Sequence, residues 1–113
     1  MNKLLISVAL TAALASGNAM AINKGDAAAG KTKSVTCAGC HGADGNSAAG
    51  TGFPILAGQY PDYLAQALKD YKSGARKSPM MAGFAAGLSE EDIYDLSAYF
   101  ASQTGVKMLP EEK

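Results

Sequence analysis

The chain is 113 residues long, the length of one small domain. Its ten basic and ten acidic side chains balance, and no segment carries the basic stripe that nucleic-acid binding needs. Nucleic acid is therefore excluded as a partner. The chain has only two cysteines and one histidine, and all three lie within the segment 37–41.

Residues 1–21 are predicted to be a cleaved secretory signal peptide. Lys3 precedes an apolar run over residues 4–14, and small residues at positions 19–21 form a cleavage site. The alternative is a retained membrane anchor, but the apolar run is well short of the roughly 20 residues that span a bilayer. We expect one exported domain over residues 22–113.

Three helices are predicted in that domain, and the fold class is all-α. The first covers about residues 25–36, where alanine is frequent. The second covers residues 61–74, with Pro61 in its first turn. The third follows Ser89 as N-cap and ends at Gly105. No stretch alternates between apolar and polar residues as a half-buried strand does.

The predicted core is thin for a stable domain of this size. Apolar faces on the second and third helices are formed by Leu64, Ala67, Leu68, Tyr71, Ile93, Leu96 and Phe100. Two glycine-rich loops, 41–59 and 73–87, also contain large apolar side chains, which argues against disorder. These loops are expected to wrap a bound group that completes the core.

The segment CAGCH, residues 37–41, has four interpretations. A zinc site needs four ligands, and no further Cys or His follows His41. A thioredoxin-like redox pair belongs in an α/β fold, which the absence of predicted strands disfavours. A structural disulfide between Cys37 and Cys40 would close only a tiny loop and stabilise little. The fourth interpretation is covalent attachment of haem c.

Each residue of the motif has a chemical role in the haem interpretation. The thiols of Cys37 and Cys40 would form thioether bonds with the two vinyl groups of the haem, and His41 would bind the iron from the proximal side. Methionine is the expected second axial ligand, because no other histidine exists. Met80, Met81 and Met108 are the candidates, and composition does not decide between Met80 and Met81.

The chain resembles the class I cytochromes c of the cytochrome c4 and c553 group. The segments that carry the resemblance are VTCAGCHGADGN, FPILAGQYPDYLAQALKDYKSG and PMMAGFAAGLSEEDIYDLSAYFASQ, in that order along residues 25–103. The resemblance implies a small fold of three main helices and loops around one covalently bound haem. It also implies that the region of residues 28–30 crosses the region of residues 94–99.

The resemblance assigns roles to individual residues. Cys37 and Cys40 match the thioether cysteines, and His41 matches the proximal ligand. Pro54 matches a proline whose carbonyl accepts a hydrogen bond from the ligand imidazole, and Met81 matches the axial methionine better than Met80. The cytochrome c4 proteins of this group resemble two such domains in tandem, whereas this chain has a single motif and is expected to hold one haem.

The function expected is electron transfer in the periplasm of a Gram-negative bacterium, without enzymatic activity or a small-molecule substrate. Redox proteins would be transient partners, and a homodimer is an open alternative. The rival function is a haem protein with an open sixth position that senses gas or splits peroxide. A dedicated subunit of a larger oxidoreductase is a third alternative. Arg76 and Lys77 are candidates for pairing with haem propionates or for partner docking, or are simply solvated.

Overall fold

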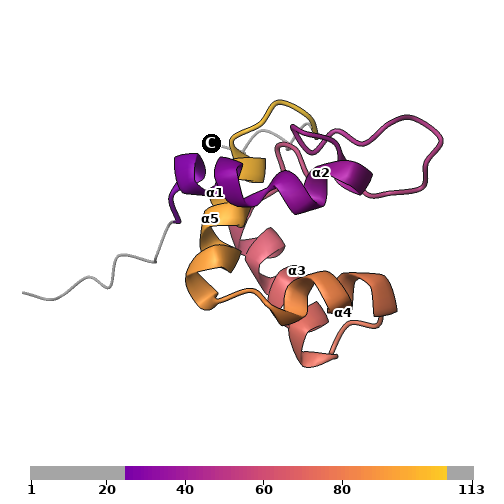
Figure 1. Cartoon of the computed structure of the whole chain (residues 1–113). Helices are drawn as coiled ribbons and strands as arrows, with labels where there is room; N and C mark the ends of the chain where they lie inside the picture. Colours follow the sequence, from indigo (N-terminus) through magenta and orange to yellow (C-terminus); the bar gives the residue numbers. More distant parts are fainter. Residues whose placement is uncertain (1–24, 107–113) are drawn as a thin grey trace, which may run out of the picture.

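A computed structural model describes residues 25–106, and these residues fold as five helices without a β-strand (Figure 1). The helices are α1 (Ala27–Lys33), α2 (Val35–His41), α3 (Pro61–Ser73), α4 (Pro79–Ala86) and α5 (Glu90–Ala101). The predicted all-helical class is therefore confirmed. No helix in the described range is long and apolar enough to cross a membrane. The predicted signal peptide and Met108 lie outside the described residues.

The single helix predicted over residues 25–36 is wrong, because two short helices meet at Ser34. The Asp26 side chain caps α1 by accepting hydrogen bonds from two backbone N–H groups of the first turn. The Ser34 hydroxyl donates to the Lys31 carbonyl at 2.7 Å, which is the kind of local side-chain bond that bends or interrupts a helix. The helix that follows, α2, carries the whole cysteine–histidine motif.

The second and third predicted helices are present. α3 begins at Pro61 and ends at Ser73. Gly74 caps its C-terminus with a φ of 84°, the left-handed conformation that favours glycine. A capping box between Ser89 and Asp92 starts α5. α5 ends at Ala101 and not near Gly105, because the chain after it turns back. The residues after α5 approach the earlier loop, where the Val106 N–H donates to the Ala57 carbonyl at 2.7 Å.

Helix α4 lies inside the segment 73–87, for which the sequence predicts a loop. Ser78 is its N-cap and accepts a hydrogen bond from the Met81 N–H, and Pro79 is its first residue. Both are ordinary helix-start signals. The sequence pattern does not reveal this helix because it is apolar all round and contains Gly83, so it has no amphipathic period.

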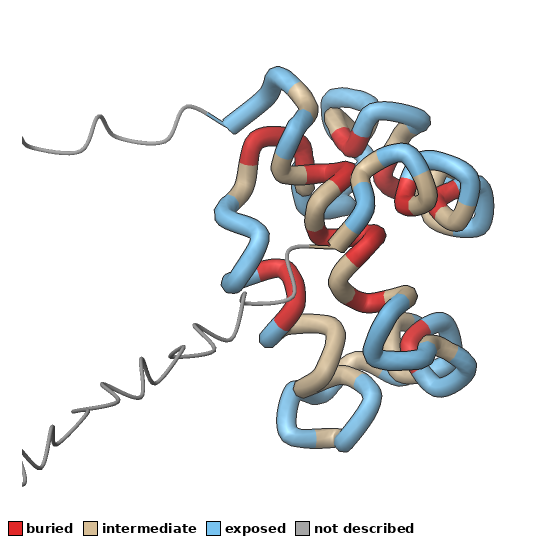
Figure 2. The backbone as a smooth tube through the Cα atoms, turned by 90° about the vertical axis from the view of Figure 1, so that its left-hand side faces the viewer, coloured by how far each residue is buried: buried red, intermediate tan, exposed pale blue. Residues whose placement is uncertain are grey.

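The core forms where α1 and α3 pack on α5, while α4 packs on α3. The stripe of Ile93, Leu96 and Phe100 predicted on α5 is buried, with exposures of 2 %, 2 % and 4 %. In Figure 2 the buried residues are red, and they are interspersed along the backbone with intermediate and exposed ones. Helix α1 crosses α5 so closely that a Cβ on Gly30 would lie 1.9 Å from the Asp95 carbonyl oxygen. The crossing implied by the family resemblance is confirmed.

A charged network fixes the same crossing. The buried Asp95 carboxylate accepts hydrogen bonds from the Asp26 N–H and from Lys33 Nζ, each at 2.7 Å. Lys33 also pairs with Asp92 at 2.9 Å. The Lys33 ammonium and the Asp26 N–H lower the pKa of Asp95, and Lys33 together with Ser89 lowers the pKa of Asp92 to about 2.

This network predicts a specific loss of stability in acid. A carboxylate whose pKa is depressed by folding stabilises the fold above its unfolded pKa, about 3.9, and this contribution disappears as the pH falls through the folded value. The melting temperature should therefore fall as the pH drops from about 4 toward 2. Thermal unfolding followed by circular dichroism across that range should show a shallower fall in Asp95→Asn than in the native protein.

The control is Glu91→Gln, which removes an exposed carboxylate near the start of the same helix. Its acid profile should keep the native slope. Asp95→Asn should also be less stable at neutral pH, by about 2 kcal/mol, because it weakens hydrogen bonds to a charged acceptor. An Asp95→Asn profile with the native slope would show that the network does not control acid stability.

Candidate functional site

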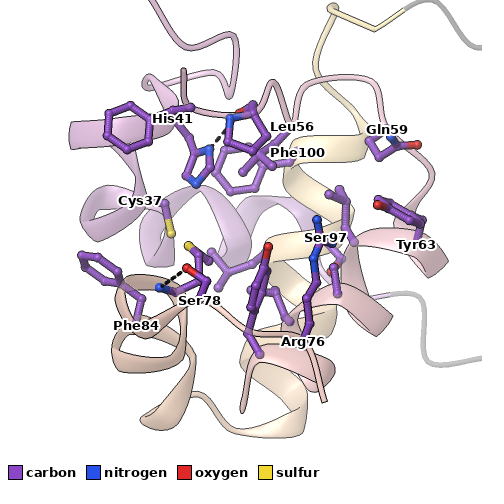
Figure 3. A pocket seen from close by; sticks show the side chains of 18 of the residues that line it. Cys37, His41, Leu56, Gln59, Tyr63, Arg76, Ser78, Phe84, Ser97 and Phe100 are labelled. Carbon is purple, nitrogen blue, oxygen red and sulfur yellow. Dashed lines mark hydrogen bonds between the residues drawn. The ribbon is translucent and has the colours of Figure 1, made fainter. Parts of the chain in front are cut away.

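A cavity of about 480 Å³ lies among α2, α3, α4, α5 and the segment 53–59. This volume is within the range of sites that hold small molecules and cofactors. Most lining side chains are apolar. Five of the six residues predicted to form the site line it together: Cys37, His41, Pro54, Met80 and Met81. Figure 3 shows the Cys37 sulfur and the His41 ring pointing into this space.

His41 is held in one orientation. Its side chain is buried, and Nδ1 lies 2.8 Å from the Pro54 carbonyl oxygen, the contact that the family resemblance implied. A carbonyl oxygen can only accept, so Nδ1 must donate and carry the proton. In the neutral imidazole Nε2 is then the nitrogen with a free lone pair, which is the form that binds a metal ion. Phe53 contacts the same ring edge-on, with centroids 6.3 Å apart.

The loop after α2 brings Pro54 back to the histidine. Gly42, with φ of 85°, ends α2 and reverses the chain. The Ser47 N–H donates to the His41 carbonyl at 2.7 Å, and the Ser47 hydroxyl donates to the Phe53 carbonyl at 2.8 Å. These bonds close the loop on itself, so the carbonyl of Pro54 is positioned by backbone geometry.

The two cysteines occupy different positions relative to the cavity. They lie three residues apart on α2, one helical turn, and therefore on one face. Cys37 lines the cavity, and burial raises the pKa of its thiol, which keeps it protonated near neutral pH. Cys40 is partly buried and is not among the lining residues. Both thiols are free.

Helix α4 presents both methionines to the cavity. Met80 is 57 % exposed, whereas Met81 is partly buried. The start of α4 is fixed by Ser78, whose hydroxyl accepts a hydrogen bond from the Met81 N–H at 3.3 Å. Both methionines are therefore candidate metal ligands on the wall formed by α4, and Met81 is the less exposed of the two.

Further lining residues come from positions that the sequence pattern assigns to the core or leaves open. The apolar face predicted on α3 lines the cavity along its length, through Leu64, Ala67, Leu68 and Tyr71. Leu96 and Phe100 of α5 line it as well. The 3.6-residue period shows that these side chains share a face, but not that the face borders a cavity.

The chemistry of this wall fits a haem. A thioether, a protonated thiol and an imidazole with a free Nε2 border one apolar space. In residues 25–106 no three side chains of His, Cys, Asp or Glu converge to hold a bare metal ion. An iron held by its own macrocycle needs only axial ligands from the protein, and this donor set can supply them.

Comparison with known proteins supports the same conclusion. The family model of cytochrome c matches residues 24–104. Cytochrome c4 of Pseudomonas aeruginosa is 50% identical over 103 residues, which are 91% of this chain and 49% of that protein. Cytochrome c-554(548) of Halomonas halodenitrificans is 48% identical over 82 residues, 70% of this chain and 98% of that protein.

The fold comparison agrees with the sequence comparison. The crystal structure of reduced recombinant cytochrome c4 from Pseudomonas stutzeri superposes with a TM-score of 0.68 at 45% identity, over 73% of this chain and 47% of that chain. The chain thus spans about half the length of the cytochrome c4 proteins that it matches.

Proposed function

Since the chain belongs to the cytochrome c family, we propose that it carries single electrons between redox proteins on one covalently bound haem c. The observation that carries this proposal is the buried His41 in the wall of an apolar cavity. Its Nδ1 is hydrogen-bonded to the Pro54 carbonyl, which leaves Nε2 available to bind iron. Bound haem would supply an iron that alternates between the ferrous and ferric states. The protein would contribute attachment, axial ligands and exclusion of water.

The cysteines would attach the group without an oxidant. Cys37 and Cys40 would each add a thiol across a vinyl group, so that sulfur bonds to one carbon and the thiol proton ends on the other. Cys37 is placed for this by its position in the cavity wall. Cys40 lies one helical turn away on the same face but does not line the cavity. Attachment would therefore require its side chain to turn toward the cavity.

His41 and Met81 are the proposed axial ligands. The hydrogen bond from Nδ1 to Pro54 would fix the imidazole plane and raise the basicity of Nε2. Met81 is favoured over Met80 because it is the more buried of the two, and a thioether that excludes water suits a low-spin carrier. With both residues bound, no position would stay open for peroxide or gas, which favours electron transfer over catalysis.

Export to the periplasm is part of the proposal. It rests on the predicted signal peptide at residues 1–21 and on the chemistry of haem c, which is attached outside the cytoplasm in bacteria. Donor and acceptor would meet the domain transiently, as redox partners generally do. Intact mass spectrometry of periplasmic protein should give the mass of residues 22–113 plus one haem. A mass that retains residues 1–21 would contradict cleavage.

A visible absorption spectrum tests the central proposal. Protein matured with haem-attachment machinery should give a low-spin c-type spectrum when reduced and a methionine–iron band when oxidised. Carbon monoxide should leave the reduced spectrum unchanged, because both axial positions are filled. A high-spin spectrum that responds to carbon monoxide would instead support the sensor or peroxidase function. Absence of covalently bound haem would refute the proposal.

A further inference from the structure

One aromatic side chain covers part of the imidazole of His41. The Phe53 ring meets the His41 ring edge-on, with 6.3 Å between the centroids and 62° between the planes. Within residues 25–106 no other aromatic ring makes such a contact with His41. His41 is 7 % exposed, whereas Phe53 is 36 % exposed. Phe53 therefore covers imidazole surface that would otherwise be open.

The backbone around Phe53 places this cover beside the hydrogen bond of the same imidazole. The Phe53 carbonyl accepts a hydrogen bond from the Ser47 hydroxyl at 2.8 Å. Pro54 follows directly, and a proline restricts the residue before it to extended conformations. The Pro54 carbonyl accepts the hydrogen bond from His41 Nδ1 at 2.8 Å. The acceptor and the covering ring thus come from neighbouring residues that are positioned together.

Cover matters at this site because the Nδ1–H group has two competing acceptors, the Pro54 carbonyl and water. Where water reaches a hydrogen bond and can replace one partner, little net stability remains. In a surrounding of low dielectric the same bond is stronger. The Phe53 ring excludes water and carries no polar atom of its own, so it favours the bond to Pro54.

We infer that Phe53 is a positioning residue for the iron ligand: its ring shields the hydrogen bond between His41 Nδ1 and the Pro54 carbonyl from water. The shielded bond keeps the imidazole in the orientation that leaves Nε2 for the iron. This inference rests on the proposed function, and it concerns how the ligand is held and not which group it binds.

Phe84 offers a matched comparison. It also lines the cavity and is 48 % exposed, but it belongs to α4 and makes no ring contact with His41. In Figure 3, Phe84 lies well apart from His41. Removing either phenylalanine ring opens the cavity, but only the loss of Phe53 uncovers the imidazole.

The test is the rate at which the His41 Nδ1 proton exchanges with deuterium, followed by NMR of the ferrous haem protein. Exchange requires the bond to Pro54 to open and water to reach the nitrogen, so the rate reports protection of that bond. In Phe53→Ala the proton should exchange about tenfold faster, because the edge-to-face contact and the apolar cover are both lost. Phe53→Leu keeps an apolar side chain without a ring, so its rate should lie between those of Phe53→Ala and the native protein.

Phe84→Ala should exchange this proton at the native rate. Amide protons of α5, measured in the same samples, should also keep their native rates in Phe53→Ala. The inference is wrong if both Phe53 variants exchange like the native protein, if Phe84→Ala is accelerated as much as Phe53→Ala, or if the α5 amides are accelerated by the same factor. Should Phe53→Ala fail to fold, Phe53→Leu against the native protein decides. A native protein without covalently bound haem would instead refute the proposed function.

Discussion

Replacing Gly30 with alanine should destabilise the protein more than the same substitution at the other two glycines inside described helices, Gly39 and Gly83. The new Cβ would lie 1.9 Å from the Asp95 carbonyl oxygen and 2.7 Å from the Tyr99 Cβ. Neither neighbour can rotate away, because one is backbone and the other is the first atom of a buried side chain. Relief requires α1 to move off α5, which would stretch the bonds that Asp95 makes to α1 and its cap.

The expected loss is about 3 kcal/mol, the upper part of the usual range for overpacking, and it outweighs the gain of up to about 1 kcal/mol from the better helix propensity of alanine. In a domain of this size, a net loss of about 2 kcal/mol lowers the melting temperature by roughly 8–16 °C. Urea unfolding of the haem-bound protein measures the free energy directly.

Gly83→Ala is the matched control, since Gly83 is also inside a helix but a methyl group added there would meet no atom within 4 Å outside its own helix. It should be neutral or stabilise by up to about 1 kcal/mol. If Gly30→Ala and Gly83→Ala unfold at the same urea concentration, the close crossing of α1 and α5 is not a stability determinant.

Replacing Met81 with alanine should change both the spin state and the potential of the haem. Loss of the thioether would leave the sixth position to water, so the ferric protein should become high-spin and lose the methionine–iron band. The reduced protein should then bind carbon monoxide. The midpoint potential should fall, because a methionine ligand raises it. Met80→Ala should retain the band and resist carbon monoxide, because Met80 is the more exposed of the two side chains.

The two variants differ only in which neighbouring thioether of α4 is removed, so similar melting temperatures would exclude a general loss of structure. The reverse result, with the band lost in Met80→Ala, would assign the iron to Met80. Retention of the band in both variants would exclude both as ligands. Because Met108 lies outside the described residues, Met108→Ala would then be the next variant to measure.

The parts of the fold that depend on neighbours in sequence could be predicted from the sequence. Ser89 and Asp92 form a capping box within one turn, and Gly74 ends α3 through its own backbone angle. The CAGCH segment is also local, because its chemistry depends on the spacing of Cys37, Cys40 and His41 within five residues. The break between α1 and α2 was not predicted, and helix α4 was missed because an apolar helix in an apolar segment has no period to detect.

The composition of the cavity wall depends on residues far apart in the sequence, so only the tertiary structure decided it. Three features follow from how the helices pack. Met81 is less exposed than Met80, Cys37 but not Cys40 lines the cavity, and Arg76 borders the same cavity. Hydrophobic periodicity predicts which side chains share a helix face. Packing decides whether that face contacts another helix or borders a cavity. The sequence by itself therefore determined α3, α5 and the chemistry of the cysteine–histidine motif, and packing decided which side chains reach the cavity.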